Sequence, residues 1–325
     1  MGRIRRRQFL ILAGTLLATP RVAVAQSIHR VAWFSVAAQS TGNVFLAPFI
    51  EGMAALGYTL GRNLVLDARW GENSREALDS LAFEAAALKP AVIVTQGAAL
   101  HAARKLTGST PVVFGFSGDP VVLGVAKSLA RPGDRFTGVT LLAYELTGKR
   151  VELLRELLPK AKRLAVLSNT NHVGDAEELA ATLKAAARFG MDVSLHRARN
   201  APELRDALSE IAAQRSDCVT IHPDGLMVQQ RETIARFSIQ HRIPTVSGWA
   251  SIAEGGNLVT YGPVLRECYR RLAYFTDRIL RGANPADLPI ELPTQFELAI
   301  NLRTAKALGL TIPQSILLRA DRIIE

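Results

Sequence analysis

Short apolar runs alternate with amphipathic stretches along most of the chain, and this alternation defines the predicted elements. The runs at residues 91–94 and 111–116 have few polar side chains and are flanked by proline or glycine. Between such runs, residues 75–88 place Leu78 and Leu81 on one helical face. Apolar strands that alternate with helices are typical of parallel sheets covered by helices on both faces. The pattern therefore predicts an α/β fold.

The same order of elements occurs twice. The strand-like residues 30–35 match residues 163–168 at an offset of 133, and the helices that follow end at Gly57 and Gly190, which are also 133 apart. This duplication predicts two doubly wound lobes with parallel sheets. Right-handed crossovers place the carboxyl ends of a lobe's strands along one edge, where open α/β sheets bind ligands. If the two edges face each other, they enclose a cleft.

A tail follows the second copy and is too short for a third lobe. It contains a predicted helix, a proline-rich stretch and a predicted strand. We expect lobe 1 to comprise residues 27–140 and about 264–282, and lobe 2 to comprise residues 141–263 and about 283–325. This division requires multiple hinge crossings, expected near residues 138–143, 261–264 and 283–291. Several crossings favour hinge closure of the lobes over free tumbling.

Residues 1–25 have the pattern of an export signal. An apolar run follows arginines at positions 3, 5, 6 and 7, and Ala23-Val24-Ala25 is the small-residue pattern that a signal peptidase cleaves, here before Gln26. The sequence Arg6-Arg7-Gln8-Phe9-Leu10 favours a twin-arginine signal, with an ordinary secretory leader as the alternative. No cysteine lies near the cleavage position. We expect a soluble periplasmic protein without a lipid anchor.

The net charge is modest once this leader is set aside. The whole chain carries 39 Lys and Arg against 29 Asp and Glu. Five of the arginines lie in the leader, and 39 minus 5 leaves 34 bases against 29 acids, an excess of 5. A small excess spread along the sequence does not form the basic stripe that nucleic-acid binding requires. We expect no nucleic-acid partner.

The two cysteines, Cys218 and Cys268, lie in an apolar strand pattern and on a helical pattern, respectively. An exported protein offers the oxidising setting in which a disulfide forms. Their different surroundings nevertheless favour two separately buried thiols over a bridge.

Several motifs, taken in sequence order, resemble one family of binding proteins. They include Gly52-Met53-Ala54-Ala55-Leu56-Gly57-Tyr58, Ser117-Gly118-Asp119-Pro120 and Glu145-Leu146-Thr147-Gly148-Lys149-Arg150-Val151-Glu152-Leu153-Leu154. The chain resembles the ABC transporter substrate-binding proteins that include the tryptophan-binding component of a bacterial importer, which have the type I periplasmic-binding fold. The resemblance covers nearly the whole mature chain. Residues 36–41 and Gln96-Gly97-Ala98 depart from the family pattern, which argues against an aromatic amino acid and leaves a small polar solute.

The resemblance implies a receptor that closes around a small solute, such as an amino acid, and presents it to the permease of an ABC transporter. It implies no enzyme activity and no cofactor, and we expect a monomer. An extracytoplasmic sensor subunit that reports to a membrane receptor is the alternative. A hydrolase of unknown substrate is a second, weaker alternative.

Position along the predicted strands selects the candidate ligand-binding residues, because each lies just past the carboxyl end of a strand or at a crossing. Hydroxyl, amide and aromatic side chains at such an edge suit a small solute. In lobe 1 the candidates are Ser35, Thr41, Gln96, Gly97, Ser117 and Asp119. In lobe 2 they are Asn169, Asn171, His172, His222, Asp224 and Trp249, with Tyr261 at a crossing.

Each of these side chains also has an ordinary structural role open to it. Ser35, Thr41 and Asn171 suit helix caps as well as ligand contacts. Asp119 precedes a proline and favours a turn, and Asp224 suits either a turn or a ligand ammonium group. For Trp249 we favour stacking on a ligand over a place in the core. A lone histidine such as His222 is more often packed or hydrogen-bonded than titrating.

Motifs that support catalysis or metal binding are incomplete in this sequence. Gly115-Phe116-Ser117-Gly118 lacks one spacer residue of a nucleophile elbow, and Gly148-Lys149 lacks the glycine that begins a P-loop. The six histidines show no metal-ligand spacing. A transcription regulator of the same fold would have a DNA-reading helix-turn-helix where this chain has its leader. We expect no metal and no catalytic residue.

Overall fold

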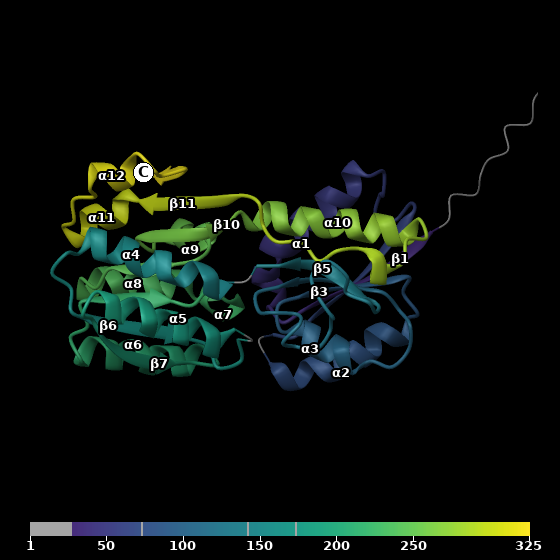
Figure 1. Ribbon diagram of the computed structural model, residues 1–325, viewed down its shortest axis with the longest axis horizontal. Helices are drawn as coiled ribbons and strands as arrows, with labels where there is room; N and C mark the ends of the chain where they lie inside the picture. The colour runs from purple at the N-terminus through teal and green to yellow at the C-terminus, as the bar shows by residue number, and fades with distance from the viewer. Residues whose placement is uncertain (1–27, 73, 142, 173) are drawn as a thin grey trace, which may run out of the picture.

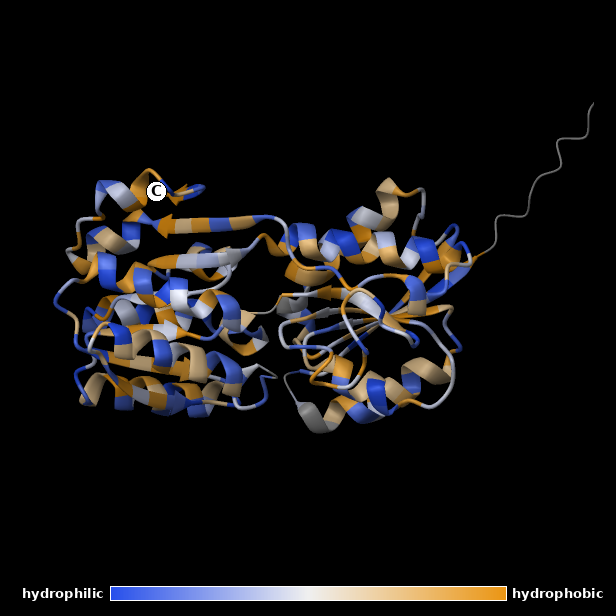
Figure 2. Ribbon diagram, in the orientation of Figure 1, coloured by the Kyte–Doolittle hydropathy of each residue, from blue (hydrophilic) through white to orange (hydrophobic). Residues whose placement is uncertain are grey.

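The computed structural model describes residues 28–72, 74–141, 143–172 and 174–325. The predicted export signal, residues 1–25, lies outside the described residues. Figure 1 shows two α/β lobes side by side, each with a central sheet and helices on both faces. Figure 2 shows apolar residues along the strands and polar residues on the outer helix surfaces. The helices of the described residues include none that is both long and apolar enough to span a bilayer.

Lobe 1 is built on a parallel sheet with the strand order β2-β1-β3-β4-β5. Its strands are β1 (His29–Ser35), β2 (Leu64–Trp70), β3 (Val92–Gln96), β4 (Val112–Phe116) and β5 (Phe136–Thr140). Its helices are α1 (Gln39–Ala55), α2 (Arg75–Ala87), α3 (Ala99–Lys105) and, from the tail, α10 (Leu265–Leu280). Helix α10 packs along α1 (Figure 1).

Lobe 2 repeats this order in β7-β6-β8-β9-β10 and adds two tail strands, β11 and β12. Its strands are β6 (Arg163–Ser168), β7 (Asp192–Arg197), β8 (Cys218–Ile221), β9 (Thr245–Ser247), β10 (Val259–Pro263), β11 (Phe296–Asn301) and β12 (Arg322–Ile324). Its helices are η1 (Ala143–Leu146), α4 (Thr147–Leu157), α5 (Asp175–Arg188), α6 (Ala201–Ala213), α7 (Gly225–Gln229), α8 (Arg231–His241), α9 (Ala250–Glu254), α11 (Leu302–Leu308) and α12 (Gln314–Leu317). The duplicated α/β architecture is confirmed.

The sheet of lobe 2 is mixed, whereas the sequence predicted parallel strands throughout. Strand β11 runs antiparallel to β10, with Pro263 opposite Phe296, and β12 runs parallel to β11. The chain leaves lobe 2 at the end of β10 and returns at the start of β11. Because exit and return lie at the same end of the sheet, the two strands must run in opposite directions.

The lobes are joined where the chain passes between them after β5, after β10 and before β11. The short helix η2 (Pro285–Asp287) and the residues after it still belong to lobe 1, because Thr140 N donates to Glu291 O and Thr137 Oγ1 donates to Leu288 O. The crossing back to lobe 2, expected near residues 283–291, therefore comes at the end of that range, after Glu291.

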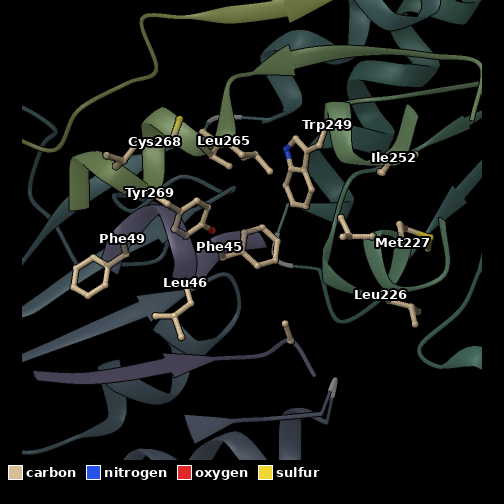
Figure 3. Close-up of a cluster of buried hydrophobic side chains, with 14 of the residues drawn as sticks. Phe45, Leu46, Phe49, Leu226, Met227, Trp249, Ile252, Leu265, Cys268 and Tyr269 are labelled. Atoms are coloured by element: carbon tan, nitrogen blue, oxygen red, sulfur yellow. The ribbon is translucent and has the colours of Figure 1, made fainter. Parts of the chain in front are cut away.

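An apolar cluster at the junction holds the lobes together. Phe45 and Tyr269 of lobe 1 pack with Met227 and Trp249 of lobe 2 (Figure 3). The ring centroids of Phe45 and Trp249 are 6.0 Å apart in an edge-to-face arrangement. Phe45 and Trp249 are 1% and 3% exposed, respectively, so the rings are buried where the two lobes meet.

Candidate ligand-binding site between the lobes

A cavity lies where the carboxyl ends of the strands in the two lobes face each other. About 40 Å³ of this cavity is open to a water-sized molecule, and part of the surrounding space is continuous with solvent. Lobe 1 contributes Val36, Gln96, Gly97, Ala98 and Ser117, and lobe 2 contributes Asn169, Asn171, His172, Asp224, Gly225, Leu226 and Trp249.

The wall from lobe 1 is set by the ends of β3 and β4. Gln96 is the last residue of β3, and its Oε1 accepts a hydrogen bond from Ser35 Oγ at 2.7 Å. This bond fixes the amide so that its NH₂ group remains for other partners. Gly97 has φ +61, a left-handed conformation that favours glycine. Ser117 follows β4 and adds a hydroxyl to the same wall.

Asp224 is the acidic side chain of the lobe 2 wall. Its Oδ1 caps α7 by accepting from Met227 N at 2.9 Å, and its Oδ2 accepts from Asn169 Nδ2 at 2.5 Å. Burial raises the pKa of Asp224, although the nearby His172 and these hydrogen bonds act against the rise. A cationic group in the cavity would therefore stabilise the ionised form of this carboxyl.

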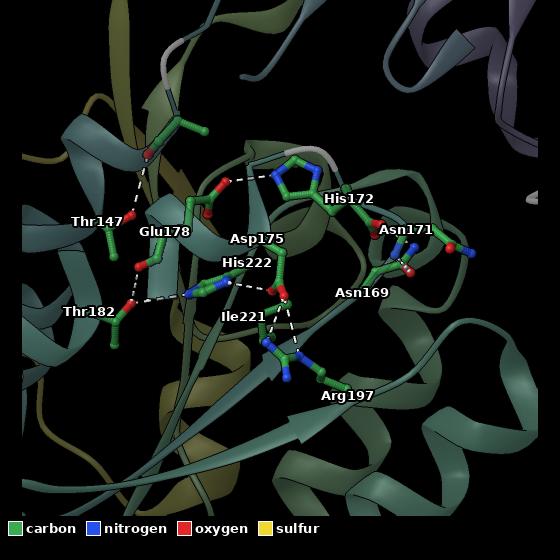
Figure 4. A network of polar contacts seen from close by, with 12 residues as sticks. Thr147, Asn169, Asn171, His172, Asp175, Glu178, Thr182, Arg197, Ile221 and His222 are labelled. Carbon is green, nitrogen blue, oxygen red and sulfur yellow. Dashed lines mark hydrogen bonds and ion pairs between the residues drawn. The ribbon is translucent and has the colours of Figure 1, made fainter. Parts of the chain in front are cut away.

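His172 lines the same wall and contacts a buried carboxylate behind it. Its Nε2 lies 2.8 Å from Glu178 Oε1 on α5 (Figure 4). Burial lowers the pKa of His172, but the hydrogen bond to Glu178 and the charges of Glu178, Asp224 and Asp175 outweigh burial and raise the pKa above its ordinary value. The cavity therefore places an acidic and a basic side chain on one wall.

The sequence matches the ABC transporter substrate binding protein family over residues 43–324. The chain belongs to this family. The protein is also similar to a tyrosine-binding protein of Clostridioides difficile (strain R20291), with 24% identity over 263 residues that cover 81% of this chain and 75% of that protein.

Two solved structures share the fold of this substrate-binding protein. A conserved domain protein from Vibrio cholerae has a TM-score of 0.85 and 24% identity, with 91% of this chain and 100% of the other covered. An ABC domain in complex with L-Trp from Streptococcus pneumonia has a TM-score of 0.83 and 19% identity, with 92% and 100% covered.

The cavity of this substrate-binding protein brings together eight of the side chains that the sequence selected. These are Gln96, Gly97, Ser117, Asn169, Asn171, His172, Asp224 and Trp249. Each follows the carboxyl end of a strand or ends one, so the rule of position found them. Their contact with a ligand stays a prediction.

Four other selected residues lie away from the cavity wall. Ser35 is buried behind Gln96, and Asp119 caps a turn by accepting from Val121 N at 2.7 Å. His222 is buried against α5, where its Nε2 lies 3.1 Å from Thr182 Oγ1. The backbone carbonyl of Tyr261 accepts from Arg150 Nε at 3.0 Å.

Thr41 belongs to α1, and its side chain lies outside the described part of the chain. The described residues contain no group of three or more His, Cys, Asp or Glu side chains placed to hold a metal ion. Cys218 and Cys268 lie in different lobes, and both thiols are buried and free. Burial raises the pKa of each thiol to about 12.

Sequence reasoning missed the apolar lining residues Val36, Ala98 and Leu226, as well as two charged residues behind the wall. These are Arg150 and Glu178, which are almost completely buried. A signal existed for Glu178, because Glu178, Thr182 and Ala185 fall on one buried face of α5. A charged residue at such a position requires a buried partner.

Proposed function

We propose that this substrate-binding protein is the solute receptor of an ABC importer and that its cavity encloses a free α-amino acid. The observation that carries the proposal is the buried carboxyl of Asp224, which lines a cavity walled by both lobes. An ammonium group beside Asp224 would compensate for the burial of this carboxyl. Gln96 and Ser117 on the opposite wall offer hydrogen bonds to the other end of the solute.

The lining also suits the carbon skeleton of an amino acid. Trp249 and Leu226 present apolar surface next to the polar groups, and an aromatic ring at such a position is a good stacking surface. Similarity to a tyrosine-binding protein and to a domain in complex with L-Trp supports an amino acid as the solute. It also argues for keeping aromatic amino acids among the candidates.

We further propose where and how the protein works. Residues 1–25 direct export, most simply by the twin-arginine route, and the mature chain acts as a periplasmic monomer without a lipid anchor. The solute enters when the lobes separate and favours the closed form because it contacts both walls only there. The protein then delivers the solute, chemically unchanged, to the permease.

Calorimetric titration of the mature chain with each of the twenty proteinogenic amino acids tests this function. We expect at least one to bind, and we expect Asp224→Asn to weaken its binding at least about 30-fold, because loss of one partner of a buried charge pair costs roughly 2 kcal/mol or more. Asparagine keeps the cap on α7. Asp119→Asn is the matched control, since Asp119 caps a turn outside the cavity. Absence of binding by every amino acid, or equal binding by Asp224→Asn, would contradict the proposal.

A further inference from the structure

Buried charges lie behind the lobe 2 wall, and His172 links them to the cavity lining. His172 contacts Glu178, and Glu178 Oε2 lies 3.8 Å from Arg150 Nη1. The side chains of Glu178, Arg150 and His172 are 0%, 1% and 7% exposed, respectively. Charges buried this deeply must be balanced by their neighbours.

Arg150 is fixed by the hinge backbone. Its Nε donates to Tyr261 O at 3.0 Å, and its Nη1 donates to Ala143 O at 3.5 Å. Both carbonyls belong to segments next to the crossings between the lobes. The guanidinium keeps its charge when buried, so it holds Glu178 in the ionised form.

With Asp224 ionised, the charges of this region balance when His172 carries a proton. The carboxyls facing His172 are Glu178 and Asp175 on α5 and Asp224 before α7. Arg150 compensates for Glu178, and Arg197 compensates for Asp175 by donating to its Oδ2 at 3.1 Å. His222 lies between Asp175 and Thr182, and among the described residues it makes no hydrogen bond or ion pair with Asp224. Asp224 is therefore the carboxyl left without a fixed cation.

A protonated His172 presents a second N–H to the cavity. Nε2 is engaged by Glu178, so Nδ1 is the nitrogen that remains for a ligand. The lining then contains one negative side chain, Asp224, and one positive side chain, His172, a pattern complementary to a zwitterion. With a neutral imidazole, Asp224 would be the sole charge on the described lining, and the cavity would favour a simple amine.

We propose that His172 acts in its charged form as the group that recognises the ligand carboxylate, so that the site selects amino acids over the amines that lack this carboxylate. The inference rests on the proposed function, because it names the group that receives the second end of the amino acid. Glu178 is a positioning residue that keeps the proton on His172. Arg150 positions Glu178.

The test compares amino acids with their decarboxylated amines: L-tryptophan with tryptamine, L-tyrosine with tyramine and L-leucine with isopentylamine. We expect the wild type to prefer the amino acid of a bound pair at least about 30-fold, as expected for loss of one buried charge partner. In His172→Gln the amino acid should bind at least about 10-fold more weakly while the amine stays within about threefold, since glutamine keeps a donor but not the charge. Asn171→Ala, an uncharged change in the same lining, should weaken both members alike. Equal weakening of both members by His172→Gln would overturn the inference and leave the proposed function intact.

A second readout needs no ligand. Proton–nitrogen spectra of the histidine-labelled protein, assigned with His172→Gln, follow the imidazole between pH 5 and pH 9. We expect His172 to stay protonated at pH values above the ordinary histidine pKa of about 6.5. In Glu178→Gln we expect His172 to lose this proton at a lower pH than in the wild type. Binding of the amino acid should likewise weaken as the pH rises through the raised pKa of His172. Titration of wild-type His172 at or below the ordinary value would overturn the inference even if amino acids bind. Failure of every amino acid to bind the wild type would overturn the proposed function and this inference with it.

Discussion

Asp175 keeps its negative charge although it is almost completely buried. Burial alone would raise its pKa, but the nearby His222 and Ser168 and the hydrogen bonds from Arg197 outweigh burial and lower the pKa from 3.8 to about 2. A carboxyl whose pKa is lower in the folded than in the unfolded chain stabilises the fold at every pH above the unfolded value. This stabilisation is lost as the pH falls from about 4 to about 2.

Replacing Asp175 should therefore reveal a pH-dependent loss of stability. We expect Asp175→Asn to lower the free energy of unfolding by about 2 kcal/mol at pH 7, the equivalent of the pKa shift. The difference from wild type should shrink as the pH approaches 2. Urea unfolding of the wild type and of Asp175→Asn at pH 7 and at acidic pH measures this difference in the free energy of unfolding. Asp79→Asn, which breaks an exposed pair with Lys105, should change stability by less than about 1 kcal/mol. A pH-independent difference would show that the carboxylate is not held ionised by these partners.

Position relative to a strand end predicted most of the cavity lining but not the direction of each side chain. Ser35 and Gln96 both end strands in lobe 1, yet Ser35 points to Gln96 and Gln96 reaches the cavity. His222 and Asp224 follow the same strand, and the first turns toward α5. Alternation of successive side chains does not separate these pairs, because Ser35 lies opposite Gln96 in the parallel register and His222 and Asp224 are two residues apart. The direction of each side chain depends on the turn that follows the strand. The sequence alone leaves that turn open.

At the scale of elements, the duplication predicted the order of five strands in each lobe, because each copy has the same run of strands and helices. The tail was harder to predict. Helix α10 occurs at the expected residues, but the stretch that ends at Glu291 pairs with β5 through backbone atoms. Backbone pairing of this kind depends on shape and not on side-chain pattern, so the sequence placed this crossing only within residues 283–291.

Helix α1 contacts both lobes, and its two phenylalanines offer a matched test. Phe45 packs against Trp249 of lobe 2 (Figure 3), whereas Phe49 packs against Trp33 within lobe 1. We expect Phe45→Leu to weaken ligand binding about 3- to 10-fold, since an aromatic pair contributes about 0.5–1.5 kcal/mol to the closed form. Phe49→Leu should leave the affinity unchanged. Both variants should lose less than about 1.5 kcal/mol of stability, because leucine keeps most of the apolar volume. Equal affinities of the two variants would mean that the Phe45 contact does not stabilise closure.

At the scale of the whole molecule, the chain crossings and the cavity act together in the closure of the lobes. The crossings keep the two sheets edge to edge, and the cavity has walls from both of them. Because a solute reaches both walls only when the lobes are together, its binding should shift the population toward the closed form. Arg150 links the cavity wall to the hinge backbone through Glu178.

Small-angle X-ray scattering tests this account most directly. The mature chain is unfolded, freed of any bound solute and refolded, and its scattering is recorded with and without a mixture of the twenty proteinogenic amino acids. We predict that the radius of gyration decreases when the mixture is added and that Asp224→Asn shows a smaller decrease at the same concentrations. Superimposable scattering curves of the wild type with and without the amino acids would contradict the claim that the lobes close around an amino acid.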